Sequence, residues 1–170
     1  ITSQAVEMNV SESMATTIDN FDSNVVSSAK MMSDEDYQNL LQIVEAEAGT
    51  EDIKGRIMVA NVIMNRVKYS EFPDNVTDVI WEYNNGVAQF SPVEDGRISE
   101  VTVSRETKEA VKQVLEGVDY SKGALFFIQK SAAAKSNISW FDKNLKRLFK
   151  HGVHEFYTYP DEVLRENAEN

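Results

Sequence analysis

Residues 51–67 constrain the fold more than any other stretch, because their apolar side chains recur at helical spacing on nearly every side. The main stripe and the positions that widen it are Ile53, Ile57, Val59, Ala60, Val62, Ile63, Met64 and Val67. A helix that is apolar all round has no face to offer to water and must be buried. We therefore expect this helix at the centre of the protein, with Thr50 as its N-cap.

Further helices and a few short strands are expected around this segment. Ser33 followed by Asp36 has the form of a capping box, and Gly49 is placed to end the helix that they begin. The other expected helices cover residues 76–83, 104–117 and 140–150, and the expected strands cover residues 124–128 and 154–159. This proportion predicts one domain of α+β class that is mainly α.

The composition excludes several kinds of chemistry. The 170 residues include no cysteine, which rules out disulfide frameworks, thiolate zinc sites and cysteine nucleophiles. Two histidines, His151 and His154, are too few for a zinc site on their own, so we predict neither a metal nor another cofactor. No apolar run approaches the roughly 18 residues of a transmembrane segment. Carboxylate, hydroxyl or lysine chemistry remains, or none.

The formal net charge of −11 is unevenly distributed. Residues 1–36 carry −6 and residues 161–170 carry −3, whereas residues 121–160 contain seven basic and two acidic residues. An acidic chain is not expected to bind nucleic acid through bulk attraction. The basic segment, in contrast, could favour a polymer that carries carboxylates.

The same division predicts the organisation of the chain. Residues 1–33 are acidic and rich in Ser, Thr and Asn, which predicts a weakly ordered leader. Residues 34–160 form the predicted domain, and residues 161–170 form an acidic tail after Pro160. The chain begins at Ile1 without an apolar signal core, which favours a mature form whose secretion signal has been removed. Nothing here predicts an oligomeric state.

Glu47 is the leading candidate for catalysis. On the first predicted helix it falls about 60° from the centre of the apolar stripe, whereas Glu45 falls about 100° away. We therefore expect Glu47 to be half-buried near Gly49, and such a glutamate has the raised pKa of a general acid. The pattern alone favours a plainer interpretation, an edge glutamate paired with Arg56 or Lys54, because perturbed carboxylates are rarer than solvated ones.

Candidates for substrate contacts are less specific. Asn65 lies four residues after Asn61 on the apolar helix, and a structural bridge is as plausible there as a substrate contact. The remaining candidates are Gln89, Phe90, Ser91, Phe127, Trp140 and His154. The loop residues among them could meet a sugar ring, although aromatic residues such as Phe127 and Trp140 more often belong to a core.

The order of the motifs resembles the SleB/CwlJ-type cell wall hydrolases over residues 37–160. The motifs are Glu47-Ala48-Gly49-Thr50-Glu51, Val59 to Val67, Phe72-Pro73, Gln89 to Val93, Asp95-Gly96, Gly123 to Phe127, Trp140-Phe141 and His154 to Tyr157. The resemblance implies a lysozyme-like or lytic-transglycosylase-like domain with a small β element and a long glycan groove. Two positions depart from the family: Thr50 replaces a glycine, and Phe126-Phe127-Ile128-Gln129 lacks the tyrosines of relatives.

The resemblance also implies a function on peptidoglycan glycan strands in the cell wall or spore envelope, outside the cell. The expected reaction is cleavage of the β-1,4 bond between N-acetylmuramic acid and N-acetylglucosamine by a lytic transglycosylase, with Glu47 as general acid and base. Ser91 or Asn65 would orient the sugar, while Phe90, Phe127 and Trp140 would supply apolar surface.

Three alternatives remain open. A hydrolytic muramidase needs a second carboxylate, for which Glu51 is the candidate in the sequence. An amidase needs a metal or a nucleophile that the composition scarcely offers. A non-catalytic wall-binding module could use the same groove without any chemistry.

Overall fold

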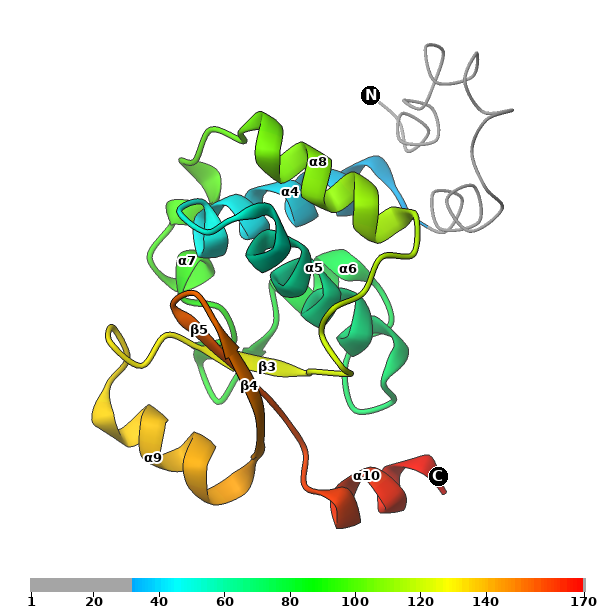
Figure 1. Ribbon diagram of the computed structural model, residues 1–170, viewed down its shortest axis with the longest axis vertical. Helices are drawn as coiled ribbons and strands as arrows, with labels where there is room; N and C mark the ends of the chain where they lie inside the picture. Colours follow the sequence, from blue (N-terminus) through cyan, green and yellow to red (C-terminus); the bar gives the residue numbers. More distant parts are fainter. Residues whose placement is uncertain (1–31, 170) are drawn as a thin grey trace.

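Helix α5 (Ile53–Lys68) runs through the middle of the protein in the computed structural model, which describes residues 32–169 (Figure 1). Its buried positions are Gly55, Arg56, Ile57, Met58, Val59, Ala60, Asn61, Val62, Ile63 and Arg66. The prediction of a central buried helix is confirmed. Its predicted N-cap was wrong: Asp52, with extended backbone, accepts a hydrogen bond from Gly55 N at 2.8 Å, while Thr50 lies in the preceding turn.

Four helical segments surround or adjoin α5. They are α4 (Asp34–Ala48), α6 (Val76–Ile80), α7 (Ser91–Glu94) and α8 (Arg105–Leu115), with a 3-10 turn η2 (Arg97–Ser99) after α7. Helices α4, α6 and α8 pack against α5 and leave it little solvent contact, while α7 packs on α4. The capping box of Ser33 and Asp36 at the start of α4 is confirmed. Ser104 caps α8, and Gly117, with φ of 101°, follows its end. Residues 1–31 and 170, which include most of the predicted leader, lie outside the described residues.

The predicted helix over residues 76–83 was too long. It ends at Ile80, and the following chain forms a hairpin of β1 (Tyr83–Asn84) and β2 (Val87–Ala88). The turn between these strands is Asn85-Gly86, with φ values of 53° and 78°. Asn-Gly is the preferred sequence for a tight hairpin turn of this kind. The hairpin leads directly into α7.

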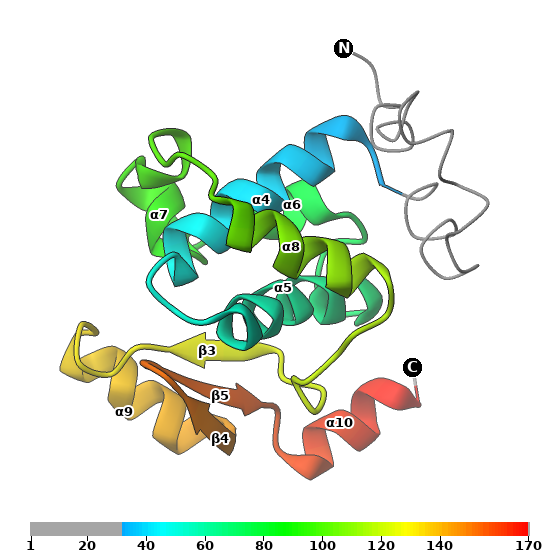
Figure 2. The ribbon, with the colours of Figure 1, turned by 45° about the horizontal axis from the view of Figure 1, so that its top comes forward.

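A three-stranded antiparallel sheet forms the second layer, with the strand order β3-β5-β4. Its strands are β3 (Phe126–Ile128), β4 (Lys146–His151) and β5 (His154–Thr158). Strands β3 and β5 confirm the two predicted strands, apart from their exact ends. In Figure 2, helices α4 to α8 lie on one side of this sheet, and α9 (Lys135–Asn144) lies on the other.

The predicted helix over residues 140–150 was wrong. Helix α9 ends at Asn144, and residues 146–151 pair with β5 as the edge strand β4. The pairing is irregular between Arg147 and Phe149, which breaks the alternation typical of a strand. Because Leu148 and Phe149 both pack against the cluster beneath α5, tertiary contacts decide the conformation of this segment.

The sheet has an aromatic core on each face. On the α5 side, Phe156 and Phe127 pack near Met58 and Val62 of α5. On the α9 side, Phe126, Tyr157 and Leu145 pack with Phe141. The tail forms α10 (Asp161–Ala168). The α+β, mainly α class is confirmed, and within residues 32–169 no helix is both long and apolar enough to span a membrane.

Candidate active site

Arg56 fixes the end of helix α4. The last carbonyl groups of a helix have no partners within it and need donors from elsewhere. The buried Arg56 donates from Nε to the carbonyl of Ala48 at 3.2 Å and from Nη2 to the carbonyl of Gly49. The end of α4 is thereby anchored to α5. This bonding also excludes a hydrogen-bonded pair of Arg56 with Glu47, which the pattern alone favoured.

Glu45, one of two glutamates at this end of α4, is fully engaged in structure. Its Oε1 accepts hydrogen bonds from Ser104 N at 2.9 Å, Ser104 Oγ at 2.9 Å and Thr107 Oγ1 at 2.7 Å. Partial burial acts to raise its pKa, but these hydrogen bonds and the charge of Arg56 hold the pKa of Glu45 below its ordinary value. Glu45 therefore joins α4 to the start of α8 as a carboxylate.

Glu47 has the opposite environment. It is half-buried, as expected, and its carboxyl group takes part in no hydrogen bond or ion pair with residues 32–169. Burial raises the pKa of Glu47 to about 7, while the charge of Arg97 acts to lower it and that of Asp95 to raise it. At neutral pH the group is therefore present in both protonation states, so it can donate a proton and later accept one.

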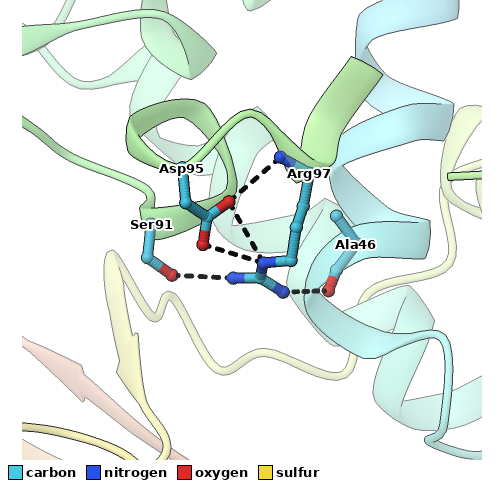
Figure 3. Close-up of polar contacts among 4 residues, drawn as sticks. All are labelled: Ala46, Ser91, Asp95 and Arg97. Atoms are coloured by element: carbon cyan, nitrogen blue, oxygen red, sulfur yellow. Dashed lines mark hydrogen bonds and ion pairs between the residues drawn. The ribbon is translucent and has the colours of Figure 1, made fainter. Parts of the chain in front are cut away.

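Arg97 is the centre of a polar network (Figure 3). The charges of Arg97 and Asp95 in this network act on Glu47. Arg97 donates from Nε to Asp95 Oδ2 at 2.9 Å and from Nη2 to Ser91 Oγ at 3.2 Å. Its Nη1 donates to the carbonyl of Ala46 on α4 at 3.4 Å. Arg97 thus connects η2, α7 and α4. The structure brings Ser91, one of the candidates, into this network.

Sequence reasoning missed Arg97 and Asp95 as site residues. Asp95-Gly96 was part of the motif set, but no role was drawn from it. Gly96 has φ of 86°, a left-handed conformation that lets the chain turn back so that Asp95 and Arg97 meet. A carboxylate and a guanidinium flanking a left-handed glycine are the signal that could have pointed to them.

An aromatic group adjoins this network. The Phe127 ring lies 6.0 Å from that of Phe90 and 5.0 Å from that of His154, measured between centroids. Phe90 directly precedes Ser91 but is itself buried in the core, so of these two rings only that of Phe127 is partly exposed. His154 is buried, its Nδ1 has no hydrogen-bond partner in the described chain, and burial lowers its pKa. Three of the predicted contact residues thus come together, from the residue before α7, from β3 and from β5.

Three other candidates lie elsewhere or serve the fold. Asn65 donates from Nδ2 to Ser121 Oγ and to the carbonyl of Ala124, both at 2.9 Å, which is the structural bridge considered above. Trp140 is 50% exposed and packs on Phe141, against the sheet face opposite Phe127. Gln89 donates its backbone N–H to the carbonyl of Glu82 and leads from the hairpin into Phe90.

Glu51, the candidate for a second catalytic carboxylate, is engaged elsewhere in the structure. Glu51 Oε1 accepts a hydrogen bond from Val153 N at 3.0 Å, so it is held against the β4–β5 turn. The carboxylate whose charge acts on Glu47 is instead Asp95, which is bound to Arg97. Among the described side chains, no three His, Cys, Asp or Glu residues are grouped so that they could hold a metal ion.

Comparison with known proteins identifies the family of this chain. Residues 50–157, well over half of the chain, match the model of the cell wall hydrolase family. The chain belongs to the cell wall hydrolase family. The resemblance and the lysozyme-like fold expected from the sequence are thereby confirmed. Glu47 lies three residues before the matched stretch.

Relatives of known name support the family assignment. The spore cortex-lytic enzyme of Halalkalibacterium halodurans is 38% identical over 119 residues, covering 70% of this chain and 34% of that protein. The spore cortex-lytic enzyme of Bacillus subtilis is 34% identical over 119 residues, covering 70% of this chain and 37% of that protein. This chain therefore matches only about a third of the length of these two hydrolases.

Solved structures of the family agree with the fold. The catalytic domain of the germination-specific lytic transglycosylase SleB from Bacillus anthracis aligns with a TM-score of 0.63 at 31% identity. The alignment covers 74% of this chain and 96% of that domain. The catalytic domain of Bacillus cereus SleB aligns with a TM-score of 0.60 at 28% identity, covering 75% and 92%.

Proposed function

We propose that this cell wall hydrolase cleaves the β-1,4 bond between N-acetylmuramic acid and N-acetylglucosamine in peptidoglycan as a lytic transglycosylase. The observation that carries the proposal is Glu47, a half-buried carboxyl group with a pKa raised to about 7 and no polar partner among residues 32–169. The similarity to a lytic transglycosylase catalytic domain supports it.

Glu47 acts twice in the proposed reaction. In its protonated state it gives the proton to the glycosidic oxygen that leaves, and the bond from that oxygen to C1 of the muramic acid breaks. As a carboxylate it then removes the proton from the 6-hydroxyl of the same sugar, whose oxygen bonds to C1. The product is a 1,6-anhydro end, no water is consumed, and Glu47 regains its proton. One group with a pKa near 7 suits both steps.

The neighbouring residues have supporting roles. Ser91, held by Arg97, offers an exposed hydroxyl group in the network whose charges act on Glu47, and it is proposed to orient the sugar. Phe127, which is partly exposed, offers apolar surface to the face of a sugar ring, with His154 packed edge-on against it. Phe90 is buried in the core and has less support as a substrate contact. The contacts of Asn65 and the position of Trp140 give these two residues less support as substrate contacts.

The proposed catalytic domain spans residues 34–160, because α4, which carries Glu47, through β5, which carries His154, form one packed unit. Acting on peptidoglycan would place this domain outside the cell, in the wall or spore envelope. The wider activity of the longer relatives is proposed for this chain only as far as this domain can supply it.

A hydrolytic muramidase is the second candidate, and Asp95 is the observation that favours it. Its charge acts on Glu47, as the second carboxylate of a glycosidase would. Its bonds to the backbone and side chain of Arg97, however, hold its pKa below the ordinary value and occupy its oxygens. An activated water therefore has less support than the internal 6-hydroxyl.

Mass analysis of digested peptidoglycan tests the proposal. A lytic transglycosylase yields anhydro ends, which are lighter by one water than the reducing ends of a muramidase. Glu47→Gln keeps the size of the side chain and removes the titrating proton, so it should abolish release of either product. Full lysis by the Gln variant, or release of stem peptides with intact glycan, would overturn the proposal.

A further inference from the structure

A lysine-rimmed cavity of about 590 Å³ lies outside the site described above. Its lining comes from the start of α5, the loop between α8 and β3, and the end of β4. The lining residues are Lys54, Met58, Asp119, Tyr120, Lys122, Phe149, Lys150 and His151. The cavity is at the β4 edge of the sheet, whereas the Phe90–Phe127 pair is at the β3 edge. It shares no residue with the proposed catalytic site.

The cationic groups of this cavity are available to a ligand. Lys54, Lys122 and Lys150 are exposed, and none forms an ion pair with a carboxylate of residues 32–169. The acidic groups nearby are already engaged. Asp119 accepts hydrogen bonds from Ser121 N and Oγ, both at 2.7 Å, and Asp52 pairs with His151 Nε2 at 2.8 Å.

Aromatic rings form part of the wall beneath these cations. Lys54 Nζ lies 5.0 Å above the ring of Tyr120, and Lys122 Nζ lies 5.5 Å above that of Phe149. Tyr120 is 43% exposed. The cavity therefore offers an apolar wall with positive charges around it, which suits a ligand that has both a carbon surface and carboxylates.

Two of the lysines occupy positions that disfavour lysine. Lys54 lies in the first turn of α5, where the helix dipole disfavours a positive charge. Lys122 has φ of 55°, a left-handed conformation that glycine or asparagine adopts more readily. Local stability does not explain either choice. Residues held at such a cost are found more often at functional sites than elsewhere.

We infer that this cavity binds the carboxylate-bearing peptide stems of a peptidoglycan strand, and so holds the wall polymer at a second point away from Glu47. The inference rests on the proposed function, since it takes peptidoglycan as the substrate. Charge complementarity supports it: in a chain of net charge −11, three lysines without carboxylate partners among the described residues surround one cavity. Stem carboxylates are borne by aliphatic carbon of amino acids that lie next to the sugars of the strand, which matches the aromatic wall.

Co-sedimentation with insoluble peptidoglycan tests this inference. The full chain with Glu47→Gln is used throughout, so that the polymer is not digested during the measurement. Replacing Lys54, Lys122 and Lys150 together by Gln should weaken binding roughly tenfold at low salt, the loss expected for three exposed ion pairs. The matched control replaces Lys108, Lys135 and Lys143, which are equally exposed and outside the cavity, and should bind as the parent does.

Chemical treatment of the polymer identifies the bound group. Peptidoglycan freed of phosphate polymers is used as it is, or with its carboxyl groups converted to amides. Amidation of the polymer should weaken binding of the parent by the same factor as the three lysine substitutions do. It should not weaken binding of the cavity variant any further. Equal binding of parent and cavity variant, an equal loss in the control variant, or undiminished parent binding to the amidated polymer would each overturn the inference. So would a difference that appears only when phosphate polymers are present.

Lys122→Gly separates binding from folding. Glycine relieves the left-handed backbone at this position, so the thermal midpoint should stay the same or rise while binding to intact peptidoglycan falls. Unchanged binding by this variant would count against the cavity. Cleavage of stem-free glycan by the chain with Glu47 intact tests the catalytic proposal separately. If stem-free glycan is not cleaved but the lysine substitutions still weaken binding to intact peptidoglycan, the catalytic proposal is wrong and the inference about the cavity stands.

Discussion

Glu45 and Glu47 stand two residues apart on the last turn of α4, and about 200° of helical rotation directs them to opposite sides. On one side, Glu45 meets Ser104 and Thr107 at the start of α8 and is held as a carboxylate. On the other side, Glu47 meets no such donors, and burial raises its pKa to about 7. The same residue type is thus a structural tie on one face and a proton-transfer group on the other.

The largest expected effect comes from removing the titrating group on the open face. Glu47→Gln should lower the rate of glycan cleavage by about 100- to 10,000-fold, the range typical for the loss of a general acid or base. Release of soluble products from purified peptidoglycan measures this. Because Glu47 has no hydrogen-bond partner among residues 32–169, glycan binding should be retained and the melting temperature should not fall. A variant that fails to fold would show that Glu47 is structural after all.

The structural face should respond in the opposite way. Glu45→Ala removes the acceptor of three hydrogen bonds and leaves the donors of Ser104 and Thr107 unpaired, so the free energy of unfolding should fall by about 2–3 kcal/mol. Denaturant unfolding measures the loss, and Glu100→Ala, an exposed glutamate without these bonds, is the control. The folded fraction should keep its cleavage rate. A stable but inactive Glu45→Ala would reverse the assignment of the two glutamates.

The pH dependence of stability sharpens the comparison. Glu47 has a folded pKa above its unfolded value, so it opposes folding once both states ionise: stability is full below pH 4.5 and is lost as pH rises through about 7. The free energy of unfolding of Glu47→Gln should therefore match that of the parent at pH 4 and exceed it at pH 8, by on the order of 3 kcal/mol. The stability that Glu45 supplies has the opposite sign, because its folded pKa is lowered: it is lost as pH falls through that pKa. Unfolding curves across pH 3 to 8 measure both trends, and parallel curves for parent and Glu47→Gln would contradict them.

The smallest expected effect concerns Arg97. Its charge acts to lower the pKa of Glu47, so Arg97→Gln should raise that pKa further, and the loss of Asp95's partner should add to the shift. Because the first step needs protonated Glu47, the alkaline limb of the pH profile of kcat/KM should move to higher pH, by less than about one unit. Arg97→Lys keeps the charge, so its limb should stay near that of the parent. A shift to lower pH would show that Arg97 does not act on Glu47.

Much of the helical layer could be predicted from the sequence, because its signals are local. The apolar periodicity of α5 and the Ser33–Asp36 capping box depend on residues within a few positions of one another. The half-burial of Glu47 followed from the same helical geometry. Thr50 was the exception, since Asp52, two residues later, offered a better cap.

The features that were missed depend on distant partners. Strand β4 exists because β5 pairs with it, and its irregular register hides the alternation that marks a strand. Arg97 reaches the carbonyl of Ala46, 51 residues earlier, which no local pattern encodes. The bridge from Asn65 to Ala124 spans a similar separation. The sequence singled out Asn65 without its partner, and it did not single out Arg97.

The grip of Arg56 on the carbonyls of Ala48 and Gly49 has a consequence for the order of events in the proposed reaction. In the proposed reaction, the Glu47 carboxyl group must come within hydrogen-bonding distance of the glycosidic oxygen and then of the 6-hydroxyl oxygen. Because Arg56 holds the end of α4 against α5, the backbone at Glu47 is fixed. Its carboxyl group can move only by rotation about the side-chain bonds. Most of the movement between the two proposed steps would then belong to the sugar, whose change of ring pucker would bring the 6-hydroxyl to the carboxylate.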